Sequence, residues 1–385
     1  MSDHPFWTYT RMVLGFRLGK GDGGYATTPL RPQVFGPVLR QARRAGHLLL
    51  LGLGAGRVAG ALAEALPPEV GLTVCDLSPD QARSVSLPWL SPQGRAQLLA
   101  DASPTALACL LLSTGLLPGR TACVLNPEVA DPGARAGLKT LQTLWSGFTP
   151  LALPENPALP SLSIAAILHP EEPDLEGFFA ALPSWALEVV VVWDGEVVPD
   201  RLPPSALAAR HLAHPLERDF AAQRNRMLAA CRGDWVLYLD GDERLSPELS
   251  GLLPALTAQA ECPAWALPRL ALSGNGVKAG FGLWPDLQVR LFRRLPQVRF
   301  VRPVHERLAG LPGPLGLALG APILHLSDLL KDASALERKL ALFDAAGGRD
   351  GLHRRSAEYP ALPRSYFSAL SAHPVAGLWP ESIGL

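Results

Sequence analysis

Blocks of apolar and polar residues in the first third of the chain predict strands and helices in turn. A continuous apolar run at His47–Leu51 is typical of a strand buried on both faces. Residues 58–66 have the spacing of a helix, and residues 72–76 predict a second strand. The apolar run at residues 105–117 predicts a buried helix or strand. Strand, glycine turn, helix and strand in this order predict a βαβ nucleotide-binding unit.

The second half of the chain repeats this pattern. Residues 161–168 form a short apolar run, residues 175–182 have helical spacing, and Glu188–Trp193 is a β-branched run. Asp219 is a suitable N-cap for a helix that follows it, and residues 234–239 predict a further buried strand. We therefore expect a second βαβ unit, in which ligands bind beyond the carboxyl ends of the strands.

Proline positions divide the chain into parts. The sequence has 38 prolines, and four of them lie between residues 146 and 160, where they oppose both helix and central strand. We predict a Rossmann-like domain at residues 1–148, a linker at 149–160, a second domain at 161–345 and a C-terminal extension at 346–385. The expected fold class is α/β, with two Rossmann-like domains.

Composition narrows the class of protein. With 35 basic and 35 acidic residues the net charge is zero, which argues against a protein that coats nucleic acid. Five cysteines without a Cys-x-x-Cys pair are a poor disulfide framework, so we expect a reduced, cytoplasmic compartment. The chain shows neither a signal peptide nor an apolar run of membrane-spanning length. Peripheral contact with the inner face of a membrane stays open.

The glycine turn after the first strand has the spacing of a nucleotide site. Gly52, Gly54 and Gly56 would let a ligand approach the backbone, and Asp76 follows the next strand, where its carboxylate can bind a ribose hydroxyl. This stretch resembles the S-adenosylmethionine-dependent methyltransferases. The resemblance implies Asp76 as the ribose ligand and Asp101 as an acid near the adenine. The alternative is a domain kept for structure or partner binding.

The most informative motif is the acidic turn after residues 234–239. Asp240 and Asp242 are separated by one glycine at the end of a predicted buried strand, where unpaired carboxylates would repel each other. A hard cation such as Mg²⁺ or Mn²⁺, bound together with a diphosphate, removes that penalty. Gly241 permits the tight turn that would point both carboxylates to one side. The alternative is an ordinary acidic turn.

An ordered set of motifs from about residue 162 to 342 carries a second resemblance. The set comprises Glu171 after the first strand, Asp194 after the second, the pair Arg224-Asn225, the motif from Asp240 to Glu243, the segment with Arg290 and Arg293, the pair His305-Glu306, and the late His325. This region resembles the family 2 glycosyltransferases with a GT-A fold and a mixed central sheet. Within them it is most similar to the bacterial lipopolysaccharide-core β-1,4-glucosyltransferase group.

This resemblance implies an inverting transferase that uses a nucleotide-diphosphate sugar. The implied metal ligands are Asp240, Asp242 and His325, and the implied substrate-binding residues are Glu171, Asp194, Arg224, Asn225, Asp240, Trp284, Arg290 and Arg293. Asp286 and Glu306 are both candidates for the base that deprotonates the acceptor, with His305 beside Glu306. Trp284 would be a sugar platform. Each of these residues also has a plain structural explanation.

The acceptor is not identified by the sequence. Saccharide, lipid-linked and protein acceptors all stay open, with cell-envelope glycan assembly as the expected setting. Two other functions stay open beside this one. The first is a methyltransferase, alone or in a bifunctional chain, using S-adenosylmethionine in the N-terminal domain. The second is a non-catalytic binding module.

Overall fold

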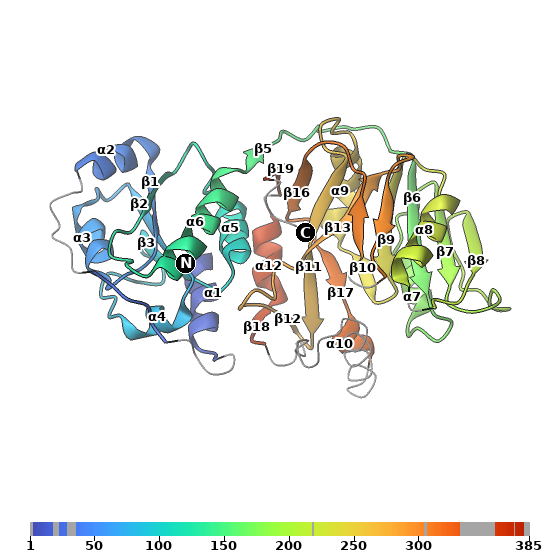
Figure 1. Ribbon diagram of the computed structural model, residues 1–385, viewed down its shortest axis with the longest axis horizontal. Helices are drawn as coiled ribbons and strands as arrows, with labels where there is room; N and C mark the ends of the chain where they lie inside the picture. The colour runs from blue at the N-terminus through green and yellow to red at the C-terminus, as the bar shows by residue number, and fades with distance from the viewer. Residues whose placement is uncertain are drawn as a thin grey trace. The chain divides into compact units, whose positions relative to one another are not determined.

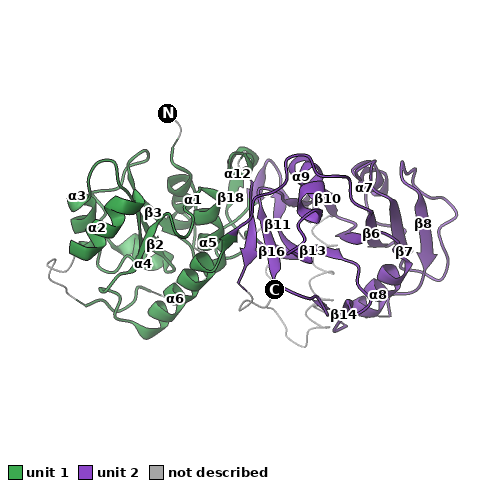
Figure 2. Cartoon of the chain, turned by 90° about the horizontal axis from the view of Figure 1, so that it is seen from above, with its two compact units in different colours: residues 1–149, 278–285, 358–373 green, residues 150–277, 286–357, 374–385 purple. Residues whose placement is uncertain are grey.

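The computed structural model describes residues 3–17, 23–28, 36–217, 219–303, 306–331, 359–372 and 374–380. The chain forms two compact units, shown in different colours in Figure 2. Unit 1 comprises Met1–Thr149, Lys278–Pro285 and Glu358–His373. Unit 2 comprises Pro150–Val277, Asp286–Ala357 and Pro374–Leu385. Each unit therefore contains segments that are far apart in the sequence.

Unit 1 is built on a parallel sheet in which the strands follow the order β3-β2-β1-β4. Its strands are β1 (His47–Leu51), β2 (Gly71–Asp76), β3 (Ala96–Ala100), β4 (Ala122–Leu125) and the separate β18 (Ala361–Pro363). Its helices are α1 (Pro5–Leu14), α2 (Gly36–Ala45), α3 (Arg57–Ala65), α4 (Pro79–Ser84), α5 (Pro104–Ser113), α6 (Pro132–Ser146) and α12 (Arg364–Ser371), labelled in Figure 1. The short β5 (Thr149–Pro150) spans the boundary between the units along the chain.

The first strand, helix and second strand lie where the sequence pattern places them. Strand β1 coincides with the predicted run His47–Leu51, and four of its five residues are buried. The run at 105–117 is the helix α5, which is buried along most of its length and packs against α6. On one face of the sheet, side chains from α2 and α3 complete a continuous apolar core with β1, β2 and β3.

The segment Lys278–Pro285 belongs to unit 1, where it is bound by the buried carboxylate of Asp101. The oxygens of Asp101 accept hydrogen bonds from the Tyr9 hydroxyl at 2.7 Å and from the backbone N–H groups of Phe281 at 2.9 Å and Gly282 at 3.1 Å. Burial raises the pKa of Asp101 to about 6. The first domain predicted from the sequence ends at residue 148 and so leaves this segment out. Composition along the chain does not indicate that a later segment packs with the first domain.

Unit 2 contains a larger, mixed sheet. Its strands are β6 (Leu162–Leu168), β7 (Glu188–Trp193), β8 (Ala209–Ala213), β9 (Trp235–Asp240), β10 (Glu243–Leu245), β11 (Ala264–Ser273), β13 (Leu287–Arg293), β14 (Arg299–Val301), β15 (Arg307–Ala309), β16 (Leu315–Leu319), β17 (Ile323–His325) and β19 (Val375–Trp379), while β12 (Gly276–Lys278) ends at the boundary. Its helices are α7 (Leu175–Ala180), α8 (Phe220–Ala230), α9 (Pro247–Thr257) and α10 (Ser327–Leu330).

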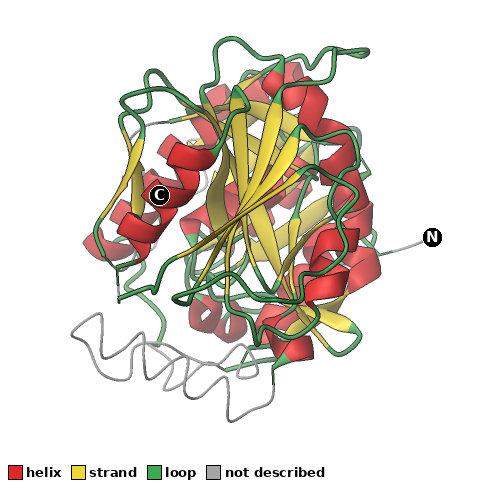
Figure 3. Cartoon of the chain, turned by 90° about the vertical axis from the view of Figure 1, so that its right-hand side faces the viewer, coloured by secondary structure: helices red, strands yellow, loops and turns green. Residues whose placement is uncertain are grey.

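The order of strands across this sheet is β19-β16-β11-β13-β9-β6-β7-β8. Strands β9, β6, β7 and β8 run parallel, whereas β13 is antiparallel to β9. Alternate residues of β6 face opposite sides, so that Ile164 packs with α7 and α9 while Ala165 packs with α8. Figure 3 shows the twisted sheet with helices on either side. The α/β class with a mixed central sheet is confirmed.

Two further properties bear on the expectations from composition. All five cysteines are free, and four of them are buried. Among the described residues, no helix combines the length and the apolar character needed to cross a bilayer.

Candidate functional site

The turn after β9 is held in place by pairing on both sides. Strand β9 ends at Asp240, and β10 begins at Glu243 and pairs antiparallel with β17, which places Glu243 opposite His325. Helix α8 approaches the turn and begins with the predicted cap, in which the Asp219 carboxylate accepts from the Ala222 N–H at 2.9 Å. These elements bring acidic and basic side chains to the carboxyl end of β9.

Seven charged side chains form a continuous row of alternating sign in unit 2, which we call the charge chain. In order, its members are Glu306, Arg224, Asp240, Arg290, Glu243, Arg269 and Asp286. The two base candidates predicted from the sequence are therefore its two ends, and Asp240 is its third member.

Asp240 receives one guanidinium group on each carboxylate oxygen. Arg224 Nη2 lies 3.1 Å from Oδ1, and Arg290 Nη2 lies 2.7 Å from Oδ2. Arg290 Nη2 also donates to Glu243 Oε1 at 2.7 Å. The guanidinium carbons of Arg224 and Arg290 lie 4.6 and 4.4 Å from the ring centroid of Tyr238. These cation–π contacts fix the two arginines beside the carboxylate.

The second half of the charge chain leads from Glu243 to Asp286. Arg269 Nη1 lies 3.0 Å from Glu243 Oε1, and Arg269 Nε donates to Asp286 Oδ2 at 2.7 Å. Gln288 Nε2 donates to the other oxygen of Asp286 at 2.8 Å. Burial opposes the charge of Arg269, but the carboxylates of Asp286 and Glu243 outweigh it and raise the pKa of Arg269.

Asp240 differs from its neighbours in exposure. Its side chain is 36% exposed, whereas those of Arg290 and Glu243 are buried. Burial alone would raise the pKa of Asp240, but Arg290 and Arg224 hold it well below its usual value. Asp240 is therefore a carboxylate that is charged at neutral pH and partly exposed.

Asp242 has a separate set of basic partners. Lys331 Nζ donates to its Oδ2 at 2.9 Å, and His325 Nε2 lies 3.6 Å from its Oδ1. The same ammonium lies 3.5 Å from Glu172 Oε2. Burial would lower the pKa of Lys331, but Asp242 and Glu172 raise it. The turn therefore presents two carboxylates that each already bind cationic groups.

Gly241 is required for space rather than for backbone conformation. A Cβ at this position would lie 3.2 Å from Leu168 Cδ2 and 3.3 Å from Glu172 Cδ, which is tighter than ordinary packing. Gly241 is not among the glycines of the described chain that have a positive φ. The glycine therefore lets the end of β6 approach the turn closely.

A divalent cation fits the donors at this turn. Mg²⁺ is usually held by one or two carboxylates together with substrate phosphates. Asp240 and Asp242 supply two carboxylates, and His325 lies beside Asp242. Within the described residues, no cluster of three or more His, Cys, Asp or Glu side chains has the geometry of a metal site.

Two of the predicted donor-binding residues have structural partners. Asp194 follows β7 at the same sheet edge as Asp240, and its Oδ1 accepts from the Leu216 N–H at 2.8 Å. Both polar atoms of the Asn225 side chain bind the backbone of Phe300, at 2.9 and 2.8 Å. Asn225 therefore fastens β14 to α8 and has no amide atom directed at a ligand.

Two other predicted residues, Glu171 and Trp284, take no part in the ion pairs described at the turn. Glu171 is exposed, and its neighbour Glu172 is the residue that contacts Lys331. Trp284 is 4% exposed and packs against Tyr9 and Phe367 within unit 1. It is a buried core residue, and the expected exposed platform is not formed. His305 lies outside the described residues.

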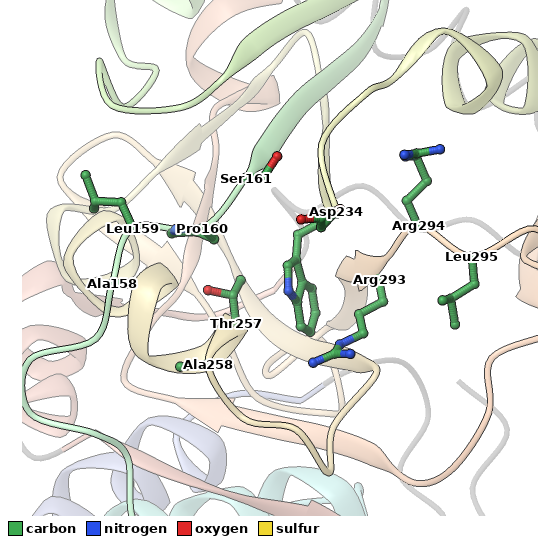
Figure 4. A pocket seen from close by; sticks show the side chains of 11 residues that line it. Ala158, Leu159, Pro160, Ser161, Asp234, Thr257, Ala258, Arg293, Arg294 and Leu295 are labelled. Atoms are coloured by element: carbon green, nitrogen blue, oxygen red, sulfur yellow. The ribbon is translucent and has the colours of Figure 1, made fainter.

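Arg293 lines a cavity at the opposite end of β9. This cavity of about 460 Å³ is bordered by residues 158–161, Asp234, Thr257 and Arg293 (Figure 4). The Arg293 guanidinium lies 5.3 Å from the ring centroid of Trp235, the first residue of β9. Because Asp240 is the last residue of that strand, Arg293 is separated from Asp240 by the length of β9.

In unit 1, the predicted glycine turn adopts the expected backbone. Gly52, Gly54 and Gly56 have φ values of 94°, 62° and 80°, which L side chains rarely adopt. Asp76 ends β2 and is buried, and Asp101 is engaged with the Lys278–Pro285 segment.

Four residues of the charge chain and of the group around Asp242 were not predicted as site residues from the sequence. They are Glu172, Glu243, Arg269 and Lys331. Glu243 stands inside the acidic motif, and Lys331 is one of only five lysines in the chain, so both had a visible signal. Arg269 lies in the middle of β11, where nothing in the pattern marks it.

Comparison with known proteins assigns the region around this turn. Residues 163–268 match the family model "Glycosyl transferase family 2". This segment, about a quarter of the chain, is similar to a family 2 glycosyltransferase domain. It contains β6, α8, β9 and the acidic turn, so the family match and the geometry concern the same part of unit 2.

Individual relatives resemble only part of the chain. A TPR repeat-containing protein of Synechococcus elongatus is 34% identical over 151 residues, which cover 39% of this chain and 36% of that protein. The crystal structure of S. aureus TarS is 14% identical with a TM-score of 0.27, covering 35% of this chain and 28% of that chain. A shorter form of TarS in complex with UDP-GlcNAc gives the same identity and TM-score, with 37% and 49% covered. The chain thus spans less than half the length of each.

Proposed function

We propose that unit 2 transfers a sugar from a nucleotide-diphosphate donor to an acceptor hydroxyl, with inversion at the anomeric carbon. The single observation that carries this proposal is that the family 2 match includes Asp240 and Asp242, the carboxylates that unit 2 gathers at the end of β9. Their position at the carboxyl edge of parallel strands is where α/β folds bind their ligands.

The residues around the turn are suited to a diphosphate. Asp240 and Asp242, with His325 beside the latter, would hold Mg²⁺ or Mn²⁺, which would neutralise charge on the leaving nucleotide. Arg224 Nη1 and Arg290 Nε are buried and have no hydrogen-bond partner within the described residues. These spare N–H groups can donate to phosphate oxygens while the other nitrogens stay on Asp240.

Asp286 is our proposed base for the acceptor hydroxyl. Its side chain is 30% exposed, compared with 15% for Glu306, which is held by Arg224. Asp286 also has a φ of 43°, an uncommon backbone for a residue other than glycine. In the reaction its carboxylate would take the hydroxyl proton as the acceptor oxygen bonds to the anomeric carbon and the bond to the diphosphate breaks.

The proposed setting is the assembly of cell-envelope glycans. Saccharide, lipid-linked and protein acceptors all present the hydroxyl group that this reaction needs, so the donor is the better starting point for an experiment.

Ligand-induced stabilisation of the full chain tests the proposal. A panel of nucleotide sugars with and without Mn²⁺ is expected to contain a donor that raises the melting temperature in a Mn²⁺-dependent way and is slowly hydrolysed. Asp242→Asn should lose both effects, whereas Asp200→Asn, on an exposed loop of the same unit, should keep them. A panel in which no donor is bound or hydrolysed would refute the proposal.

A further inference from the structure

The glycine turn of unit 1 is already occupied by the protein's own side chains. In a nucleoside site of this type, the acid after the second strand binds ribose hydroxyls and the turn offers free N–H groups. Here Asp76 is fully buried. Its Oδ2 accepts from the Leu53 N–H at 2.6 Å and its Oδ1 from the Ser78 N–H at 2.8 Å. The third donor to this carboxylate is the hydroxyl of Tyr25.

Tyr25 makes the two contacts that a ribose hydroxyl would make. Its hydroxyl donates to Asp76 Oδ2 and accepts from the Gly54 N–H at 3.0 Å. Burial, together with the neighbouring Asp76, raises the pKa of Tyr25 well above its usual value, so the hydroxyl keeps its proton. The acid and the turn are therefore joined by an internal phenol.

The segment at residues 23–28, which we call the strap, is tied to unit 1 on both sides of Tyr25. The Tyr25 N–H donates to Gln81 Oε1 at 3.1 Å, and Gln81 Nε2 donates to the Gly54 carbonyl at 2.7 Å. Further along, the Thr28 N–H donates to the Glu128 carbonyl at 2.9 Å. These bonds hold the strap against the turn and against the segment after β4.

The glycines of the turn are closely approached by side chains of the protein itself. A Cβ on Gly54 would lie 2.6 Å from Glu128 Cβ and 3.0 Å from Asn126 Nδ2. A Cβ on Gly52 would lie 2.5 Å from Val129 Cγ2. The missing side chains thus make room for residues 126–129. S-adenosylmethionine does not fit this arrangement, because the Tyr25 hydroxyl already binds both the Asp76 carboxylate and the Gly54 N–H.

We propose that the strap is an internal substitute for a nucleoside. In the native chain the turn binds neither S-adenosylmethionine nor adenosine, because Tyr25 holds Asp76 and Gly54. Removal of the Tyr25 side chain exposes a site for the ribose of an adenine nucleoside, with Asp76 as the ribose ligand. This proposal is an alternative to the prediction that unit 1 is a methyltransferase.

Equilibrium titration of the full chain with S-adenosylmethionine and with adenosine tests this proposal. We expect no binding to the native protein up to about 1 mM ligand, and at least about ten-fold tighter binding to Tyr25→Ala. Adding Asp76→Asn to that variant should abolish the gain. Tight binding to the native chain, or no gain on removing Tyr25 from a folded chain, would overturn the proposal.

A milder variant keeps the proposal testable if Tyr25→Ala does not fold. Tyr25→Phe retains the ring and removes only the hydroxyl. We expect its Gly54 amide to exchange with deuterium at least about ten-fold faster than in the native chain, because the acceptor of that N–H is lost. An unchanged exchange rate at Gly54 would show that Tyr25 does not occupy the turn. Neither measurement depends on the proposed sugar transfer in unit 2.

Discussion

Two carboxylates at equivalent places in the two units have opposite surroundings. Asp76 ends the parallel strand β2 of unit 1, and Asp240 ends the parallel strand β9 of unit 2. Asp76 is fully buried and accepts hydrogen bonds from neutral donors: two backbone N–H groups and the Tyr25 hydroxyl. Asp240 is partly exposed and binds two guanidinium groups.

The difference shows how surroundings decide what a strand-end acid can do. Burial raises the pKa of Asp76, whereas at Asp240 the same penalty is outweighed by Arg290 and Arg224, which lower the pKa. At the first site, the hydrogen-bond donors to the carboxylate are neutral groups of the protein itself. Charged partners keep the second carboxylate ionised and exposed, with unused guanidinium N–H groups nearby. This contrast supports our proposal that the second arrangement, and not the first, binds a charged ligand.

The largest expected effect comes from neutralising the second carboxylate of the turn in unit 2. Asp242→Asn should lower kcat for donor turnover with Mn²⁺ by at least about 100-fold, because the cation would lose one of its two carboxylates. The measurement is steady-state release of the nucleotide. Turnover near the native rate would show that Asp242 is not a metal ligand and would weaken the contrast with unit 1.

The next largest effect is on stability, at Arg290. Arg290→Met leaves Asp240 and the buried Glu243 each short of one cationic partner. We expect the free energy of unfolding of unit 2 to fall by about 3–5 kcal/mol, as is usual when one member of a buried ion pair is removed. Urea unfolding at neutral pH measures this change.

The control for this prediction is Arg299→Met. Arg299 is an exposed arginine at the start of β14, so its loss should cost less than about 0.5 kcal/mol. If Arg290→Met were as mild as this control, the charge chain would not be a buried, interdependent network.

The sequence predicts local structure well and side-chain partners poorly. The strand at β1, the cap at Asp219 and the acidic turn after β9 depend on periodicity and on residues close in the chain, and the structure has them where predicted. The partners of that turn come from other strands. Arg269 reaches it from β11, and no local pattern identifies an arginine in mid-strand as part of a site.

The same limit explains the residues that did not join the site. Glu171 and Glu172 are adjacent, so periodicity alone does not decide which one faces Lys331. Arg290 and Arg293 share one strand, but residues three apart in a strand point to opposite faces of the sheet, so Arg290 contacts Tyr238 and Asp240 while Arg293 contacts Trp235. Tyr25 lies between stretches without periodicity, which is why its contact with Asp76 was not expected.

A smaller effect is expected at the neutral site of unit 1. Tyr25→Phe removes one donor from Asp76 and the acceptor of the Gly54 N–H. Loss of these two buried hydrogen bonds should cost about 2–3 kcal/mol in the free energy of unfolding of unit 1. Tyr366→Phe, which loses one hydroxyl contact to the Pro5 carbonyl, is the matched control and should cost about 1 kcal/mol. Equal costs would mean that the Tyr25 hydroxyl is not shared between two buried groups.

The smallest expected effect is a pH dependence that arises from Asp76. Because burial raises the pKa of Asp76 above its usual 3.8, the folded chain binds this proton more tightly than the unfolded chain. Its contribution to stability is thus present at low pH and is lost as the pH rises through the folded pKa. The native chain should lose about 1.4 kcal/mol relative to Asp76→Asn for each unit of that pKa shift.

Urea unfolding between pH 3 and pH 7 measures this difference, and Glu69→Gln, at an exposed site, should show none. A difference that grows in favour of the native chain as pH rises would mean that Asp76 is held ionised like Asp240, and that the two sites are alike.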